Sequence, residues 1–572
     1  MPLPRLVPAD AVPVAVQETS LAVDALARNV CNTWQEATAN GGPPFSVVVV
    51  GAGAYGGYLA AKLAEFQPQR RVLLLEAGPF LVGEHVQNLG PVGLGILPAI
   101  DPAQDPLEAR DLVWGLPWRG NTPLPGTAYC CGGKSLYWGG WCPRLTAADL
   151  AQWPAAVAAA LQTEYDRVES ELGVVPGTDF LSGDLLAKLQ GRVDAVVPGI
   201  PDLDLSLPGG PVEAAPIAVQ GSAPASGLFS FDKYSSLPLL VAALRRDSER
   251  AGFDDAKRRL FLVPRCHVIR VVVRNGIAEE LEVDAAGIRT TLPLGPGTRV
   301  VLAAGAIETT RIALLSAPTP LMGRNLMAHL RTDLTFRIRR TALPSSGPLV
   351  QTAALLVRGA TAGRRFHLQL TASTSAGGSD ALLYQMIPDL DMLDEQLANV
   401  DPAWVTLTVR GIGEMAPDTG TPAPNAVGSW MDLSPYEVDE YVVPRAYVHL
   451  QLCPGDLATW TAMDRTAQEL AMAIAGAPQD IEYLYDGGWQ TQPYPLQRPF
   501  PGWHWGLGTT YHEAGTLWMG ASPADSVTTE LGRLHHVQNL YACDQSLFPT
   551  VASVNPVLTG TTLARRLARL LP

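Results

Sequence analysis

A strand, a glycine-rich turn, a helix and a second strand follow one another between Phe45 and Glu76, and this unit constrains the fold most. The first strand reads FSVVVV and the second reads RVLLL, with a helix predicted between them over 58–66. Strands that are apolar at nearly every position are typical of the centre of a parallel sheet covered on both faces. The unit therefore predicts an α/β domain built on a parallel sheet.

Three glycines in this unit, Gly51, Gly53 and Gly56, have the G-x-G-x-x-G spacing, and Glu76 follows the second strand. In this fingerprint the first glycine permits a tight turn, the second lets the backbone approach a pyrophosphate, and the third lets helix and strand pack closely. Free N–H groups at the start of the helix favour the anion, and the acidic residue accepts hydrogen bonds from a ribose. Because every part of the fingerprint is present, the unit predicts a dinucleotide-binding site.

A second glycine-rich segment covers residues 126–145 and reads GTAYCCGGKSLYWGGWCPRL. Its glycines, which include Gly132 and Gly133, lie among large aromatic residues such as Tyr137 and Trp138. Glycines allow a backbone to approach a planar ligand closely. The alternative is a surface loop with buried aromatic side chains, and the segment alone does not decide between the two.

The order of the patterns predicts a discontinuous cofactor domain with a second domain inserted into it. An apolar strand, VVLAA at 300–304, runs through a glycine into a helix and repeats the style of the first unit. Between about 334 and 455, segments such as LTFRIRR, RFHLQLTAS and AYVHLQL alternate apolar and polar residues, which is typical of half-buried antiparallel strands. We expect an N-terminal extension over 1–44 with a helix from Leu21 to Ala39, a first part of the cofactor domain over 45–333 with insertions at about 146–260 and a proline-rich loop at 203–227, an inserted antiparallel domain over 334–500, and the last part of the cofactor domain over 501–572.

Composition and charge exclude several classes of protein. A hydrophobic fraction of 47% in 572 residues excludes a disordered chain, and the net charge of −14 argues against a nucleic-acid partner. No apolar run reaches the roughly 18 residues of a membrane helix, and the N-terminus lacks the apolar core of a signal peptide, so we expect a cytoplasmic protein without a membrane partner. The seven cysteines have no metal-binding spacing, so no metal site is expected.

Four separated segments together resemble the glucose-methanol-choline (GMC) oxidoreductase family. They are the fingerprint with Glu76, the GGKSLYWGG loop, the strand and helix VVLAAGAIETTRIALLS with the following GRNLMAHL, and the C-terminal YHEAGTLWMG, NLYACDQSLFP and SVNPVLTG. The loop and the C-terminal segments look most like the branch of pyranose oxidases and related bacterial sugar (C-glycoside) oxidases. The resemblance covers nearly the whole chain after residue 44.

The resemblance implies a bound FAD in a Rossmann-like domain and a substrate-binding domain built on an antiparallel sheet. The family's flavin site corresponds to the fingerprint glycines and Glu76, to Gly132, Gly133, Ser135, Tyr137 and Trp138 in the second loop, and to Asp544, Asn555 and Pro556 near the C-terminus. Asp544 is expected beside the ribityl chain. Asn555 is expected to cap the last helix, whose N-terminus would stabilise the negative charge of the reduced flavin. Fungal pyranose oxidases attach the flavin through a histidine where this chain has Tyr137, so non-covalent FAD is expected.

His512 and Asn555 match the family's catalytic pair. The implied reaction oxidises an alcohol, a secondary hydroxyl of a sugar or glycoside, to a carbonyl. His512 would take the hydroxyl proton while a hydride passes to flavin N5, and Asn555 would bind the same oxygen. A histidine base predicts a rate that rises with pH through an apparent pKa of roughly 6 to 7.5. Trp503, Trp505 and Tyr511 are candidate substrate contacts, with core packing as the alternative.

Two other functions stay open at this point. The family includes hydroxynitrile lyases, whose FAD does not change its redox state, and a flavin-binding module without catalysis would carry the same fingerprint. In the leading interpretation, molecular oxygen or another electron acceptor reoxidises the flavin.

Overall fold

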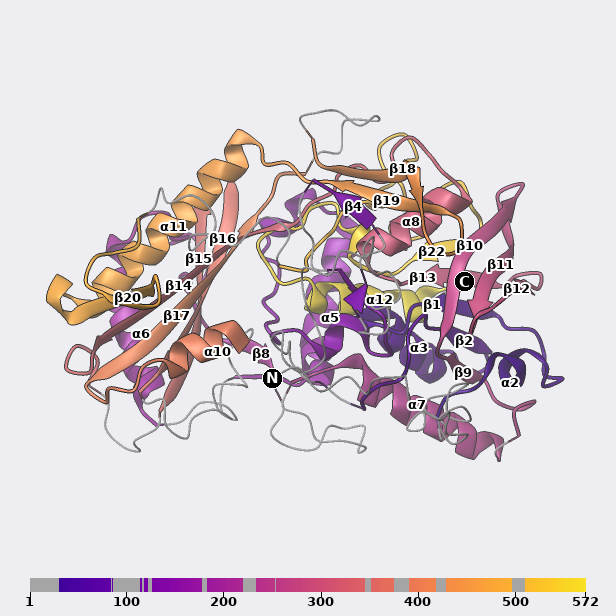
Figure 1. Ribbon diagram of the computed structural model, residues 1–572, viewed down its shortest axis with the longest axis horizontal. Coiled ribbons are helices and arrows are strands. Elements are labelled where there is room, and N and C mark those ends of the chain that lie inside the picture. The colour runs from indigo at the N-terminus through magenta and orange to yellow at the C-terminus, as the bar shows by residue number, and fades with distance from the viewer. Residues whose placement is uncertain are drawn as a thin grey trace, which may run out of the picture.

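Two large sheets form the framework of the protein (Figure 1), with the parallel sheet on the right of the view and the antiparallel sheet on the left. The predicted fold class, a Rossmann-like domain combined with an antiparallel domain, is therefore confirmed. The structure is a computed structural model, and it describes residues 30–83, 85, 114–115, 118–121, 126–176, 183–219, 233–252, 254–344, 351–374, 390–417, 428–495 and 510–572.

The parallel sheet has five strands in the order β22-β13-β1-β2-β9, and all neighbours run parallel. They are β1 (Val47–Val50), β2 (Val72–Leu75), β9 (Leu260–Val263), β13 (Arg299–Leu302) and β22 (Leu540–Ala542). Val47 and Val49 belong to one hydrophobic core, and Val48 and Val50 belong to another. The sheet is thus buried on both faces, and it joins segments from the two ends of the chain.

Helix α3 (Ala54–Phe66) begins directly after Gly53 and packs against α7 (Ser236–Ala251) and α12 (Val557–Leu570). Gly51 has a φ of +98°, which glycine adopts readily and other residues rarely do. A Cβ atom at Gly56 would lie 1.9 Å from the carbonyl oxygen of Gly51. The helix can therefore approach the turn only because residue 56 has no side chain.

The antiparallel sheet has seven strands in the order β21-β20-β14-β17-β16-β15-β7. They are β7 (Val212–Ala214), β14 (His329–Arg339), β15 (Thr352–Thr361), β16 (Arg364–Ser373), β17 (Trp404–Glu414), β20 (Ile481–Tyr485) and β21 (Gly488–Gln490). Helix α11 (Pro454–Ala475) packs on β14, β16 and β17, and Figure 1 shows it along the outer side of the sheet. The other face of the sheet carries Arg331, Gln369 and Arg410 into a cavity shared with the parallel sheet.

The sequence predicts half-buried strands in this sheet, and that prediction is wrong for its centre. All of β17 and the first eight residues of β14 are buried, including their polar positions. The polar face is buried because it faces the cavity and the other sheet instead of bulk water. The alternation of apolar and polar residues therefore predicts the two faces of these strands correctly, but it does not predict that the polar face is buried.

The segment AYVHLQL forms a strand in a different sheet from the one predicted. It contains most of β19 (Pro444–His449), which pairs with β18 (Trp430–Val438) and β4 (Trp118–Gly120) in a separate three-stranded sheet. Alternation alone specifies which residues share a face, and it does not specify the partner strand.

The proline-rich stretch at 203–227 is not a loop throughout. It contains β7, which pairs with the edge of β15, and β8 (Pro216–Ala218), which pairs with β6 (Val174–Pro176). Short edge strands tolerate proline because its missing N–H need not enter the ladder. Of the predicted helix at 21–39, residues 21–29 lie outside the described residues, and α2 (Trp34–Thr38) starts at a capping box formed by Thr33 and Glu36.

The remaining elements surround the two sheets. They are β3 (Trp114–Gly115), β5 (Thr127–Ala128), β10 (Cys266–Arg274), β11 (Ile277–Ala285), β12 (Ile288–Pro293), α5 (Ala155–Leu172), α6 (Leu185–Val196), α8 (Ala306–Ser316) and α10 (Leu390–Leu397), with 3-10 helices at Gly133–Leu136 (η3), Asp149–Gln152, Val197–Gly199, Pro478–Asp480 and Gln545–Leu547 (η7). None of the helices in the described ranges is long and apolar enough to cross a bilayer.

The contact between α3 and its preceding turn gives a first prediction. Gly56→Ala would push a methyl group into a backbone oxygen, so we expect a loss of about 1–3 kcal/mol of stability, as for other overpacked sites. Gly191→Ala in α6 is the matched control, because a Cβ at Gly191 has no neighbour within 4 Å and alanine favours helix. Thermal unfolding should show a lower midpoint for the first variant and an unchanged or higher one for the second. Equal midpoints would contradict this role of Gly56.

Candidate active site

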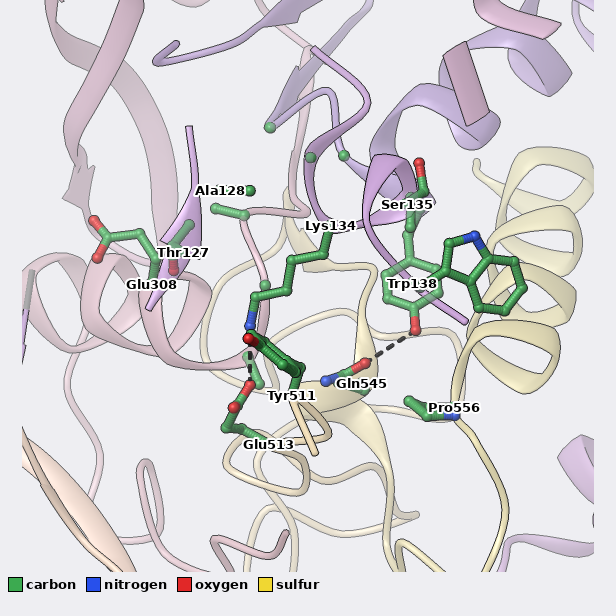
Figure 2. Close-up of a pocket in the computed structure, with 18 of the residues that line it drawn as sticks. Thr127, Ala128, Lys134, Ser135, Trp138, Glu308, Tyr511, Glu513, Gln545 and Pro556 are labelled. Carbon is green, nitrogen blue, oxygen red and sulfur yellow. Dashed lines mark hydrogen bonds and ion pairs between the residues drawn. The ribbon is translucent and has the colours of Figure 1, made fainter. Parts of the chain in front are cut away.

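One cavity of about 370 Å³ brings most of the predicted site residues together. It lies at the carboxyl ends of β1, β2 and β13 and continues to the polar face of the antiparallel sheet. Figure 2 shows Ser135, Trp138, Tyr511 and Pro556 arranged around this space. The predicted residues that line it are Gly51, Gly53, Glu76, Gly133, Ser135, Tyr137, Trp138, Tyr511, His512, Asn555 and Pro556.

Three predicted cofactor residues do not line the cavity. Gly56 is in the contact between α3 and the turn, and Gly132, with a φ of +90°, precedes η3 and donates its N–H to the carbonyl of Ala52 at 2.8 Å. Asp544 is buried and accepts hydrogen bonds from the Thr309 hydroxyl at 2.5 Å and from the Ser546 N–H at 2.9 Å. It anchors the end of β22, while its neighbour Gln545 lines the cavity. Trp503 and Trp505 lie outside the described residues.

The two glycine-rich segments meet at the start of α3. A Cβ at Gly133 would lie 3.0 Å from the Cα of Gly53, so the backbones approach each other closely. Helix α3 presents its unpaired N–H groups at this point, with no side chain from Gly53 to cover them. A cradle of bare backbone at a helix N-terminus fits the pyrophosphate of a dinucleotide such as FAD.

Glu76 follows β2 and lies at the bottom of this cradle. It is buried, and its carboxylate accepts hydrogen bonds from the N–H of Ala52 at 2.8 Å and of Gly78 at 3.0 Å. Burial nevertheless raises the pKa of Glu76 to about 7, while the backbone hydrogen bonds act in the opposite direction. Additional donors, such as ribose hydroxyls, would favour the ionised form. This residue therefore fits the ribose-binding role of the fingerprint.

His512 and Asn555 reach the same cavity from segments more than forty residues apart in the chain. The Nδ1 atom of His512 lies 2.8 Å from Nδ1 of His329, the first residue of β14. Burial lowers the pKa of His512 well below its usual value, and the neighbouring cations Lys134 and Arg410 act in the same direction. His512 is thus neutral at pH 7, as a base must be, and the expected pKa of roughly 6 to 7.5 is too high.

Asn555 does not cap the last helix, so that prediction is wrong. Helix α12 begins at Val557 with Pro556 at its N-cap position. The side chain of Asn555 instead turns to the antiparallel sheet, where its Oδ1 accepts a hydrogen bond from Nε2 of Gln369 at 2.9 Å. A bond to a fully buried partner holds the amide in the cavity wall.

Several site residues were not predicted, and four of them lie on the antiparallel sheet. Arg331, Gln369 and Arg410 line the cavity, and His329 lies behind His512. Arg331 and Arg410 each donate from Nε to Asp333, at 2.8 Å in both cases. The signal for these residues was present, because polar side chains at every second position share one face. It was interpreted as a solvent-facing surface.

Lys134 and Glu513 form a further unpredicted pair at the cavity wall. Their Nζ and Oε2 atoms are 3.3 Å apart, and the ammonium group lies 5.4 Å from the centre of the Tyr511 ring. Figure 2 shows this pair between the second glycine-rich loop and the segment that carries His512. Opposite, Gln545 accepts a hydrogen bond from the Tyr55 hydroxyl at 3.0 Å. These contacts tie the C-terminal segment to the cofactor cradle.

The fold belongs to the discontinuous α/β class, and the cradle at the start of α3 fits a dinucleotide. Residues 424–564 match the GMC oxidoreductase family, so the C-terminal part of the chain carries that family's sequence pattern. No curated protein matches the chain significantly.

Two solved structures share the fold over most of their length. A formate oxidase from Aspergillus oryzae RIB40, from a study of FAD modification, has a TM-score of 0.58 and 15% identity, covering 92% of this chain and 98% of that chain. Pyridoxine 4-oxidase from Mesorbium loti has a TM-score of 0.53 and 17% identity, with the same coverage of 92% and 98%. At these identities the likeness shows the common fold.

The pKa of Glu76 gives a second prediction. Ribose hydroxyls donate to the ionised carboxylate, so binding of FAD should strengthen as the pH rises to about 7 and stay constant above it. Titrating flavin-free protein with FAD on both sides of neutrality, followed by flavin fluorescence, measures this. Glu76→Gln, which cannot ionise, should bind FAD more weakly at pH 8 and without the pH dependence. A wild-type affinity that is constant through neutral pH would contradict the assignment.

Proposed function

We propose that this protein is an FAD-dependent oxidoreductase of the GMC type that oxidises a secondary hydroxyl of a sugar or glycoside to a carbonyl. One observation carries the proposal: a neutral His512 and the amide of Asn555 line the same cavity as a backbone cradle suited to a dinucleotide. The family match over residues 424–564 supports the same chemistry.

The chain's own residues would perform the proton transfer and the charge stabilisation. Bound FAD supplies the hydride acceptor for the carbon that carries the hydroxyl. His512 takes the hydroxyl proton, because a neutral imidazole is a base at neutral pH. Asn555 can donate from its amide nitrogen to the same oxygen and stabilise the negative charge that develops on it. The C–O single bond then becomes a carbonyl.

The polar wall of the cavity favours an oxygen-rich substrate over an aliphatic or sterol alcohol. Beyond His512, the antiparallel sheet presents Arg331, Gln369 and Arg410. The two guanidinium groups offer several N–H donors in fixed directions, which suits hydroxyl oxygens around a sugar ring, while the amide of Gln369 holds Asn555. Tyr511 lines the cavity and can contact the face of such a ring, whereas the substrate role of Trp503 and Trp505 stays a prediction.

A non-covalent FAD is the third prediction. Tyr137 occupies the position at which fungal pyranose oxidases have the linking histidine, and it lines the cavity. Without an imidazole at this position the histidyl linkage cannot form. Precipitating the purified protein with acid should therefore release the yellow colour into the supernatant as FAD. Colour that stays in the washed pellet would show a covalent bond and overturn this part of the proposal.

The fourth prediction concerns His512. His512→Ala should retain FAD but reduce it about 10²–10⁴-fold more slowly with a good substrate, the usual effect of losing a general base. Anaerobic stopped-flow measurements with monosaccharides, glycosides, sterols and aliphatic alcohols test both the base and the substrate class. The wild-type rate should stay constant from neutral pH to well below pH 6.5, since burial lowers the pKa of His512.

His535→Ala is the matched control for this experiment. His535 is hydrogen-bonded to the Ser526 hydroxyl at 3.0 Å and does not line the cavity, so this variant should behave as wild type. A substrate that is cleaved without bleaching the flavin would favour the lyase alternative. FAD-loaded His512→Ala that is reduced at the wild-type rate would remove His512 from the mechanism.

A further inference from the structure

Two chains of hydrogen bonds connect adjacent backbone carbonyls to the two candidate catalytic residues. In the first, Nε2 of His329 lies 3.0 Å from the carbonyl oxygen of Ala552, and Nδ1 of His329 lies 2.8 Å from Nδ1 of His512. The two imidazole rings are nearly perpendicular, with an interplanar angle of 88°. His329 thus links the candidate base to the backbone of the C-terminal segment.

The second chain reaches Asn555. Nδ1 of His367 is hydrogen-bonded to the carbonyl oxygen of Ser553, and Nε2 of His367 lies 3.1 Å from Nε2 of Gln369. The same Gln369 nitrogen lies 2.9 Å from Oδ1 of Asn555. His367 and Gln369 are neighbours on one face of β16, because residues two apart in a strand share a face.

The chemistry of the groups fixes the direction of the first chain. A backbone carbonyl only accepts, so Nε2 of His329 must carry a hydrogen. A neutral imidazole has one N–H, which leaves Nδ1 of His329 as an acceptor. Nδ1 of His512 must therefore carry the hydrogen of that bond. The remaining nitrogen of His512, Nε2, then has a lone pair and no hydrogen.

The second chain has a direction for the same reason. The Ser553 carbonyl accepts from Nδ1 of His367, so Nε2 of His367 is an acceptor. Gln369 must then donate from its amide nitrogen, both to His367 and to Oδ1 of Asn555. With Oδ1 engaged, Asn555 has its amide N–H groups available for the cavity. The first chain of hydrogen bonds thus leaves Nε2 of His512 as an acceptor, and the second leaves the amide nitrogen of Asn555 as a donor.

The surroundings support neutral histidines in both chains. His329 is 1% exposed and His367 is 0% exposed. Burial lowers the pKa of His329 to about 4 and lowers that of His367 well below its usual value. Ala552 has a φ of +51°, in the left-handed region that residues other than glycine rarely adopt. Such strain is typical of a site where the backbone is held in one orientation.

We propose that His329 and the His367–Gln369 pair are positioning residues that fix the proton arrangement of the catalytic pair, keeping Nε2 of His512 as a proton acceptor and the amide nitrogen of Asn555 as a donor. This inference rests on the proposed alcohol oxidation for its kinetic consequences. The hydroxyl proton of the substrate moves to Nε2 of His512, and the resulting imidazolium keeps its Nδ1–H bond to neutral His329. The hydride goes to FAD, so charge and electrons balance.

A spectroscopic test does not depend on turnover. The FAD-loaded protein labelled with ¹⁵N-histidine should show His512 as the tautomer protonated at Nδ1 and His329 as the tautomer protonated at Nε2. The resonances are assigned by their absence in His512→Ala and His329→Leu. His512 protonated at Nε2 in the resting enzyme would overturn the proposal, whether or not an alcohol is ever found to reduce the flavin.

A kinetic test uses two substitutions of His329. His329→Leu removes the acceptor for His512, so flavin reduction should slow about 10- to 150-fold, the effect of losing one hydrogen bond to a charged group. His329→Gln keeps an oxygen that accepts and a nitrogen that donates, and it should restore most of that loss. Equal rates for the leucine and glutamine variants would count against the proposal. If none of the alcohols reduces the flavin of the wild-type protein, the proposed function fails. The spectroscopic test then decides the inference alone.

The second chain of hydrogen bonds is tested by replacing its donor, the amide of Gln369, with an acceptor. Gln369→Glu has nearly the same shape, but a carboxylate accepts where the amide donates, so Asn555 must rotate and turn its oxygen to the substrate. Flavin reduction should slow about 10- to 100-fold, near the effect of losing one oxyanion donor, with FAD retained. Gln396→Glu is the matched control: Gln396 is equally buried and bonds Thr371 and Thr408 in the same sheet. Equal rates for the two glutamate variants would show that the loss is not specific to Asn555.

Discussion

The close approach of α3 to the turn that precedes it is the contact on which the rest of the site depends. The Gly51 carbonyl oxygen occupies the space that a side chain at residue 56 would need. Because the helix starts there, its N-terminus points into the cavity, and the second glycine-rich loop can cross it at Gly133. A larger residue at any of these positions would separate the helix, the turn and the loop. The pyrophosphate cradle would be lost with them, since it consists of backbone alone.

The other half of the site depends on a polar sheet face that is withdrawn from water. Burying charged and polar groups is costly unless they are hydrogen-bonded to one another. The antiparallel sheet meets this condition through Asp333, which accepts from both Arg331 and Arg410, and through the bonds of His329, His367 and Gln369. These bonds also orient the groups. The arrangement that makes burial tolerable is therefore the one that positions the candidate catalytic pair.

The sequence could predict the cofactor half because its signals are local. The strand, turn and helix between 45 and 66 specify one another through short-range geometry, and the second strand with Glu76 completes a fingerprint that the glycine spacing alone would leave weak. The second loop, whose Gly133, Ser135, Tyr137 and Trp138 line the cavity, was undecided from its own pattern and was assigned through the family resemblance. Asn555 lines the cavity, as the resemblance implies, but it does not cap α12. Its amide is held by Gln369, which lies 186 positions away in the chain.

The substrate half could be predicted only as a pattern. Alternation in β14, β16 and β17 specified which residues share a face, but it did not specify whether that face meets water or another domain. That choice depends on how the two sheets are placed, which no short segment encodes. The partner strand of β19 was missed for the same reason. His329, Arg331 and Arg410 became visible as site residues only once both sheets were seen to enclose one cavity.

This difference between the halves also explains how one fold can serve different reactions. The cradle is built from backbone and tolerates few residues besides glycine, so it restricts the sequence at a small number of positions. The wall made by the antiparallel sheet is built from side chains on one face, and each can change without altering the strand that carries it. In the proposed function, the wall that carries Arg331 and Arg410 would select the substrate, whereas the acceptor state of His512 would depend on His329, which is anchored to the backbone behind it.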